Sequence, residues 1–228
     1  MKKIITAAFF ISSFIVTAQE KTSNWSIGAD VQSRYVWRGV ELGGASPSIQ
    51  PYAEYSTGKF TFGAWGAYSL GGTNLAQELD LYLTVDLSDD FHLTIIDYYF
   101  PTDGTGNNNN YLDFGSTTGH VYEAALAFGG TDRFPLGVSV ASNFAGASTG
   151  STYVELNYTT DSGLGLFAGG VFGDDDGYYF TTGSGLINLG LSKSKDIKIT
   201  DNFSLPVNAS LIVNPDAENV YLTFGFSL

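Results

Sequence analysis

Apolar and polar residues alternate strictly along the stretch from Gln77 to Leu87, QELDLYLTVDL. The odd positions from 79 to 87 carry Leu or Val, whereas the even positions from 78 to 86 carry Glu, Asp, Tyr, Thr and Asp. A period of two is typical of a β-strand, because an α-helix repeats every 3.6 residues. The two faces of this strand therefore meet different environments.

Similar alternation recurs along most of the chain and predicts an all-β protein of about twelve strands. These are Trp25–Arg38, Ile49–Tyr55, Phe60–Leu70, Gln77–Leu87, Phe91–Phe100, His120–Phe128, Leu136–Phe144, Tyr153–Tyr158, Leu164–Phe172, Leu186–Ser192, Phe203–Val213 and Val220–Leu228. An even number of antiparallel strands returns the chain to the side on which it began.

The connections between these strands alternate in length. Every second one is short, as in Ser56–Gly58 and Ser88–Asp90, whereas most of the others are longer and rich in Gly, Asn and Asp, as in Gly39–Ser46 and Pro101–Gly119. Outer-membrane barrels have short periplasmic turns and longer external loops in this arrangement. Two connections break this pattern: Lys193–Asn202 is long for a periplasmic turn, and Asn214–Glu218 is short for an external loop.

The first 18 residues have the pattern of a cleaved signal peptide. Lys2 and Lys3 precede an apolar run from Ile4 to Val16, and small residues follow before Gln19. The run is too short for a spanning helix, which needs about 20 residues. We expect residues 1–18 to be removed and residues 19–228 to form one barrel domain.

Composition narrows the class of protein further. Charged residues make up 14% of the chain, below the ~25% of an ordinary soluble domain. The net charge is −13, and without Lys2 and Lys3 it becomes 8 − 23 = −15, which argues against nucleic acid as a partner. There is no Cys, hence no disulfide and no thiolate metal site. No later stretch resembles a spanning helix, and the other architecture that crosses a bilayer is a closed β-barrel.

A secreted soluble β-barrel would also alternate, with its apolar face turned inward. The polar faces favour the membrane, because they carry mostly Gly, Ser, Thr, Asn and Tyr where a water-exposed sheet would carry many Lys and Glu. The last strand ends on Val220, Leu222, Phe224, Phe226 and Leu228, all apolar. We therefore expect a closed antiparallel transmembrane β-barrel in the bacterial outer membrane, with both termini periplasmic.

Two segments carry a family resemblance. Ser33-Arg34-Tyr35-Val36-Trp37-Arg38-Gly39, followed by Pro47-Ser48-Ile49-Gln50, resembles the opening motif of the TorF family of porins. The end of the chain, from Leu205-Pro206-Val207 through Asn214-Pro215 to the final aromatic strand, is similar to that family too. The resemblance spans residues 25–228 and implies an outer-membrane barrel that acts as a channel.

Polar residues on the inward face are the candidates for a pore lining. They are Asp30, Gln32, Arg34, Arg38, Gln50, Glu54, Glu78, Asp80, Asp86 and Glu123. Parity allows Arg34 to lie opposite Glu54 and Arg38 opposite Gln50. Such charges could orient polar solutes across the pore, or simply neutralise each other and rigidify the wall.

Other chemistry is weakly supported. Asp174-Asp175-Asp176-Gly177 could attract a divalent cation, but it lacks spaced ligands and is better interpreted as a solvated acidic loop. The two histidines, His92 and His120, fall in no catalytic motif. His92 and Asp97 cannot share a strand face without a bulge, and the pattern leaves open which points inward. We expect no enzyme activity, no metal and no cofactor.

The function that follows is a porin-like channel for passive diffusion of small hydrophilic solutes through a narrow polar lumen. The alternatives are a non-conducting structural or adhesive barrel and a secreted soluble one. Expected partners are outer-membrane lipid and lipopolysaccharide, the diffusing solutes, and the barrel-assembly machinery during insertion. The acidic surplus suggests a preference for cations.

Overall fold

A computed structural model describes residues 24–71, 76–101, 110–114 and 119–228. The expected signal peptide lies outside these ranges. The strands are β1 (Trp25–Gln32), β2 (Tyr35–Trp37), β3 (Val40–Leu42), β4 (Ser48–Thr57), β5 (Phe60–Ser69), β6 (Gln77–Asp86), β7 (Phe91–Tyr99), β8 (His120–Phe128), β9 (Leu136–Gly146), β10 (Thr152–Thr159), β11 (Leu164–Asp174), β12 (Gly183–Lys198), β13 (Ser204–Asn214) and β14 (Asn219–Ser227). Within the described ranges, no helix is long and apolar enough to cross a membrane.

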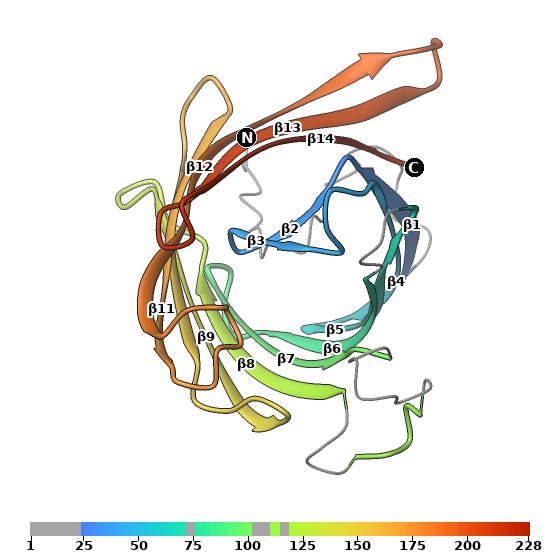
Figure 1. Ribbon diagram of the computed structural model, residues 1–228. Coiled ribbons are helices and arrows are strands. Elements are labelled where there is room, and N and C mark those ends of the chain that lie inside the picture. Colours follow the sequence, from blue (N-terminus) through green and yellow to red (C-terminus); the bar gives the residue numbers. More distant parts are fainter. Residues whose placement is uncertain (1–23, 72–75, 102–109, 115–118) are drawn as a thin grey trace.

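Twelve of these strands, β1 and β4 to β14, form one closed antiparallel barrel (Figure 1). Each barrel strand pairs with its neighbour in the chain, and β1 pairs with β14 to close the ring. Closure pairs the first and last strands of the sheet with each other, so the sheet has no unpaired end strand. The predicted all-β fold, its closure and its number of barrel strands are confirmed.

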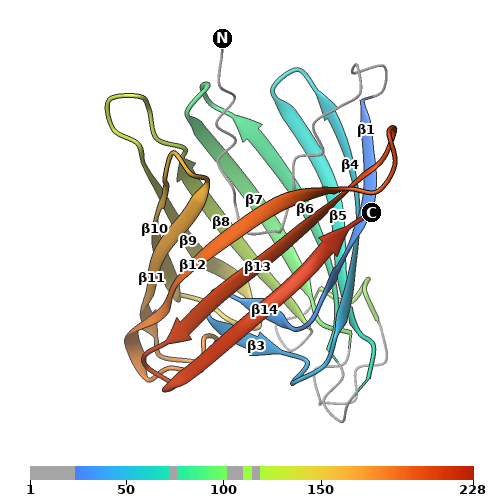
Figure 2. The ribbon, with the colours of Figure 1, turned by 90° about the horizontal axis from the view of Figure 1, so that it is seen from above.

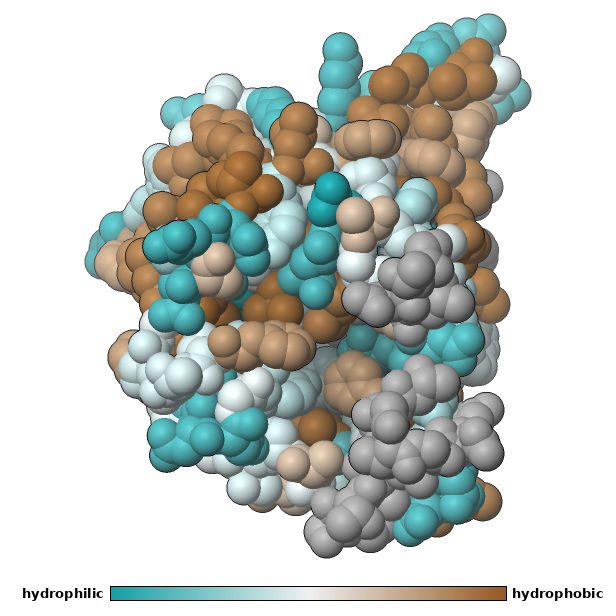
Figure 3. Space-filling model, viewed as in Figure 1, coloured by the Kyte–Doolittle hydropathy of each residue, from teal (hydrophilic) through white to brown (hydrophobic). Residues whose placement is uncertain are grey.

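The apolar faces of the strands point outward. On β6, Leu81 is exposed, whereas Glu78, Asp80 and Tyr82 on the opposite face are buried. The same alternation holds on β14, where Leu222 and Phe224 are exposed and Thr223 is buried. In the space-filling view, brown apolar residues gather along the upper margin, and pale and teal residues occupy much of the rest of the face that is seen (Figure 3). The barrel is thus polar inside and apolar outside.

Two predicted elements differ from the structure. The expected strand 25–38 ends at Gln32, and the following residues fold into the small sheet β2–β3 inside the ring (Figure 1). The expected long turn 193–202 is shorter, because β12 continues to Lys198 and pairs with β13 as far as Ser204. This β12–β13 hairpin projects away from the barrel wall (Figures 1 and 2).

The β2–β3 hairpin turns at Arg38 and Gly39, between the paired residues Trp37 and Val40. Both turn residues have positive φ, 48° at Arg38 and 81° at Gly39, as a two-residue type I′ turn requires. A non-glycine residue in this region costs about 1–2 kcal/mol, so the contacts of Arg38 must offset a local strain. Seen from the side, β3 lies toward the end that carries the β13–β14 turn (Figure 2).

The seam between β1 and β14 is the shortest junction in the wall. Three residue pairs join the strands, from Asp30–Ser227 to Gln32–Gly225. Backbone hydrogen bonds between Ala29 and Leu228, of 3.2 and 2.9 Å, extend it at one end. Ser227 also donates a side-chain hydrogen bond of 2.5 Å to Asp30 inside the barrel.

The seam can be tested with an engineered disulfide, since the chain has no Cys. Ala29 and Leu228 each donate a backbone hydrogen bond to the other. Asp30 and Ser227 therefore form the adjacent non-hydrogen-bonded pair of the antiparallel ladder, and the Cα atoms of such a pair lie about 4.5 Å apart. That spacing suits a disulfide. We expect the double variant Asp30→Cys/Ser227→Cys to crosslink on mild oxidation, as measured by non-reducing electrophoresis.

The matched control is Asp30→Cys/Thr223→Cys, which moves the second thiol about 13 Å along the same face of β14. It should stay reduced. Equal crosslinking of the two variants, or none in the first, would contradict the pairing of Asp30 with Ser227.

Candidate functional site

The β2–β3 hairpin is held in the lumen by a buried ion pair at its tip. Arg38 donates hydrogen bonds of 2.5 and 2.8 Å to the two carboxylate oxygens of Glu123 on β8. The side chain of Glu123 is fully buried and that of Arg38 is 10% exposed. A bidentate pair with these exposures fixes both position and orientation of the hairpin tip.

Aromatic rings surround the Arg38 guanidinium. Its central carbon lies 4.5 Å from the ring centroid of Trp37 and 4.7 Å from that of Tyr153 on β10. Tyr179, from the β11–β12 connection, stacks on Trp37 at 5.2 Å and accepts a hydrogen bond from Arg38. Burial raises the pKa of Tyr179, so its hydroxyl stays protonated at neutral pH.

The β11–β12 connection is held in place by Asp174. This carboxylate accepts hydrogen bonds from Ser151 at 2.8 Å, from the Tyr179 amide at 3.1 Å and from the Thr181 hydroxyl at 2.8 Å. Asp174 is fully buried. The interpretation of residues 174–177 as a wholly solvated acidic loop is therefore wrong at Asp174, which organises the loop that carries Tyr179 into the lumen.

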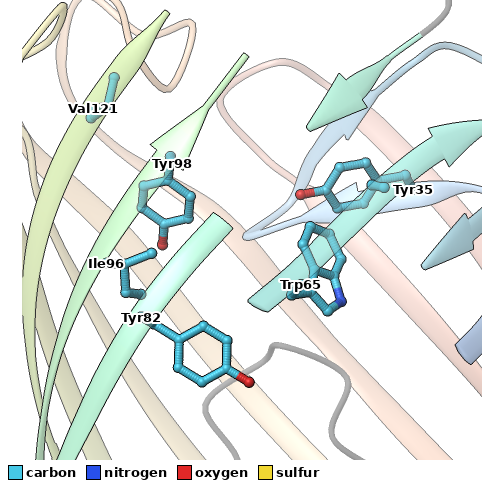
Figure 4. Packing of buried hydrophobic residues seen from close by; sticks show 7 residues of the cluster. Tyr35, Trp65, Tyr82, Ile96, Tyr98 and Val121 are labelled. Atoms are coloured by element: carbon cyan, nitrogen blue, oxygen red, sulfur yellow. The ribbon is translucent and has the colours of Figure 1, made fainter. Parts of the chain in front are cut away.

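The other side of the hairpin packs on the wall formed by β5 to β7. Tyr35 lies 5.6 Å from Trp65 on β5, between ring centroids, and donates a hydrogen bond of 2.9 Å to Glu78 on β6. Figure 4 shows Tyr35 above Trp65, with Tyr98 on the adjacent wall. The hairpin thus contacts opposite walls of the barrel and narrows the lumen.

The tip of the hairpin also fits closely against β12. A Cβ added at Gly39 would lie 1.8 Å from the carbonyl oxygen of Ile187, so no larger residue fits without movement of the backbone. The Gly39 carbonyl in turn accepts a hydrogen bond of 3.1 Å from Asn214 on β13.

The ten pore-lining candidates fall into two groups. Six are buried in the barrel: Asp30, Gln32, Gln50, Glu78, Asp80 and Glu123. Four are partly exposed: Arg34, Arg38, Glu54 and Asp86.

The pairings expected among these candidates are wrong. Arg34 forms its ion pair with Glu41, across the base of the hairpin. Arg38 pairs with Glu123 and not with Gln50, which is registered opposite Asp30. The alternation along the sequence gave wrong partners for Arg34 and Arg38 because the chain leaves the barrel wall after Gln32.

Several residues that organise the lumen escaped the sequence analysis. Tyr153 and Tyr179 both contact the Arg38 guanidinium. Glu155 accepts hydrogen bonds from Tyr153 and Asn188 at 2.5 and 2.9 Å. Glu155 and Asn188 both lie at inward positions of strands whose apolar and polar residues alternate. This alternation in the sequence could have identified them as residues of the lumen. Tyr179 lies in a connection, where no periodicity marks a direction.

The ambiguity between His92 and Asp97 is resolved without a bulge, because the register between β6 and β7 is continuous. The Nδ1 atom of His92 lies 2.7 Å from a carboxylate oxygen of Asp86, on the inward face of the barrel. Asp97 lies on the other face and contacts His120 at 2.8 Å and the Tyr111 hydroxyl at 3.0 Å. Burial and this hydrogen bond raise the pKa of Tyr111 to about 12, so it remains a donor.

A cavity of about 80 Å³ lies between the hairpin and the wall, with room for several water molecules. Its lining is mixed aromatic and polar: Tyr35, Val36, Trp37, Arg38, Gly39, Gln50, Trp65, Asp80, Ile96, Tyr98, Ser139, Tyr153, Glu155, Phe167, Asn188, Ser210 and Ile212. Among the described residues, no cluster of His, Asp and Glu is arranged to hold a metal ion.

The buried ion pair makes a quantitative prediction for stability. Arg38→Ala leaves Glu123 buried with a hydrogen bond from Tyr98 but without its cationic partner, which should lower the free energy of unfolding by about 3–5 kcal/mol. Arg34→Ala is the matched control, because the Arg34 side chain is 38% exposed and its pair should contribute about 0–1 kcal/mol. Urea unfolding of the refolded protein measures both. Equal effects of the two substitutions would show that Arg38 does not hold the hairpin.

Comparison with known proteins adds a family without an activity. The comparison with curated proteins gave no match. Residues 18–199 match the model of the family Gcw_chp, described as a bacterial protein of unknown function. That description names no porin, so the resemblance to TorF porins stays a prediction. Because the match covers most of the sequence, including the hairpin and twelve of the fourteen strands in full, the chain belongs to the Gcw_chp family.

Proposed function

We propose that this protein is an outer-membrane barrel that passes small hydrophilic solutes through a narrow lumen. The observation that carries the proposal is the closed twelve-stranded wall with apolar residues outside and polar residues around an internal cavity. A barrel with these faces suits a lipid surround and a hydrated interior. Eight-stranded barrels are filled by side chains and porins of sixteen or more strands are open, so twelve strands suit a small pore.

The hairpin acts as the selectivity element in this proposal. It places Arg38, Trp37 and Tyr35 across the lumen. Aromatic rings and polar groups line the remaining space. Solutes pass beside the hairpin, so size and hydrogen-bonding capacity limit which of them cross. Buried carboxylates outnumber Arg38 inside the barrel, which favours cations over anions.

A second function, a non-conducting barrel with a structural role, is favoured by one observation. The hairpin and the loop carrying Tyr179 meet over Trp37, where the rings stack, and both enter from connections at the same end of the barrel. If the remaining space does not connect the two ends, the barrel is plugged and its function lies in its surface.

Conductance in planar bilayers separates the two functions. Gln32 and Ser48 are directly paired on β1 and β4, so residues 34–46 can be replaced by an Asn-Gly turn without stretching the wall. We expect small, steady conductance from the refolded wild-type protein and a severalfold increase in the hairpin-deleted variant, because the lumen widens.

The control shortens the exposed β12–β13 turn at residues 200–202, which lies outside the lumen and should leave conductance unchanged. Current only after hairpin deletion would support the plugged barrel. The absence of current in both proteins would overturn the channel proposal.

Insertion into lipid has its own test, based on two exposed leucines. Leu222 is 69% exposed on the outer face of β14, and Leu112 is 79% exposed in the β7–β8 connection. An Arg on a lipid-facing strand costs up to about 2–4 kcal/mol, whereas an exposed substitution in a soluble protein changes stability by about 0.5 kcal/mol or less. Leu222→Arg should therefore reduce the folded fraction in vesicles, measured as heat-modifiable migration, and Leu112→Arg should not. Equal yields would favour a soluble barrel.

A further inference from the structure

One carboxylate in the lumen has an oxygen without a partner. Asp80 is 2% exposed, lines the cavity beneath the hairpin, and its Oδ1 makes no hydrogen bond. A buried acceptor left in this state carries a desolvation cost that a bound donor can remove. The neighbouring acid on the same face, Glu78, interacts with the Asp80 side chain and accepts a hydrogen bond of 2.9 Å from the Tyr35 hydroxyl.

The register places aromatic rings on both sides of Asp80. Trp65 on β5 and Tyr98 on β7 are its direct cross-strand partners, and such pairs have Cβ atoms about 4.5–5.5 Å apart. Tyr35 covers Trp65 from the hairpin. The carboxylate therefore lies at the base of a space walled by rings, which are good surfaces for a cation and for its hydrocarbon part.

The charge of the cavity selects the sign of the ligand. Three charged side chains line it, Arg38, Asp80 and Glu155. The bidentate pair with Glu123 neutralises Arg38, which leaves two carboxylates. No Lys and no second Arg contributes to this lining among the described residues.

The chemistry of the lining selects an organic cation over a bare metal ion. Hard cations prefer six or more oxygen ligands, and the described residues offer no such cluster. Six of the lining residues are aromatic: Tyr35, Trp37, Trp65, Tyr98, Tyr153 and Phe167. A primary ammonium group can donate an N–H to Asp80 Oδ1 while its short alkyl chain packs against the rings.

We propose that this cavity is a binding site for small primary alkylammonium solutes, with Asp80 as the acceptor of the ammonium N–H. The inference deepens the proposed channel function, on which it rests for the route by which a solute reaches the cavity. Binding is measured on detergent-solubilised protein without a membrane, so the site and the channel can fail separately.

The experiment uses the refolded full barrel and n-propylammonium chloride as the probe. Two of the three tryptophans, Trp37 and Trp65, line the cavity, whereas Trp25 lies exposed on the outside. In a Trp25→Phe background the remaining fluorescence reports on the cavity. We expect a saturable change with n-propylammonium and none with 1-propanol or propionate at equal ionic strength, and calorimetry should give the same dissociation constant.

Asp80→Asn tests the acceptor, because it keeps the shape and removes the charge. We expect binding to weaken about tenfold or more, as for the loss of a hydrogen bond to a charged group. Asp86→Asn is the matched control on the same face of β6, beyond the cavity and partly exposed at the β6–β7 end. It should bind as the wild-type protein does.

Three results would overturn the site. They are equal affinity for 1-propanol, equal competition by K⁺, and unchanged affinity in Asp80→Asn. If Asp80→Asn does not fold, the comparison of n-propylammonium with 1-propanol on the wild-type protein decides the matter alone. Binding in detergent without conductance in a bilayer would keep the site and remove the channel.

Discussion

A buried charge must be paired, and in this barrel that constraint falls on Arg38. The residue sits at the tip of a hairpin that has left the wall, with a left-handed backbone conformation that a non-glycine residue adopts at a cost. Its two hydrogen bonds to Glu123 join segments 85 residues apart. Without that pair, Glu123 would be buried with a hydrogen bond of 3.1 Å from the Tyr98 hydroxyl but without its cationic partner.

The aromatic residues around the pair serve a second physical purpose. Trp37, Tyr153 and Tyr179 stack on one another and on the guanidinium, which excludes water from the ion pair and strengthens it. Asp174 in turn orders the loop that supplies Tyr179. The lumen is therefore shaped by side chains from the connections as much as by the strands of the wall. A change in the β11–β12 connection should alter the position of the β2–β3 hairpin, because Tyr179 stacks on Trp37.

The arrangement also explains why the cavity lies where it does. The hairpin crosses the lumen but does not fill it, so space remains beside Asp80, Trp65 and Tyr98 on one wall and Glu155 on another. Polar groups on the barrel interior can be hydrated or can bind a solute, whereas the outer leucines and phenylalanines find no polar partner. The barrel in this way combines an apolar outer surface with a polar interior.

The sequence by itself determined the strands, their two faces and the number that close the barrel, because alternation is a local property of the pleated backbone. Tertiary structure decided which inward residues meet. Tyr35 and Trp37 continue the parity of β1, so nothing local distinguished a longer strand from a hairpin, and Arg-Gly is a weak turn signal beside Asn-Gly. The pairing of Arg38 with Glu123 depends on how far the hairpin reaches and on the stagger accumulated around the ring. Those quantities sum over many strands and appear in no single stretch of the chain.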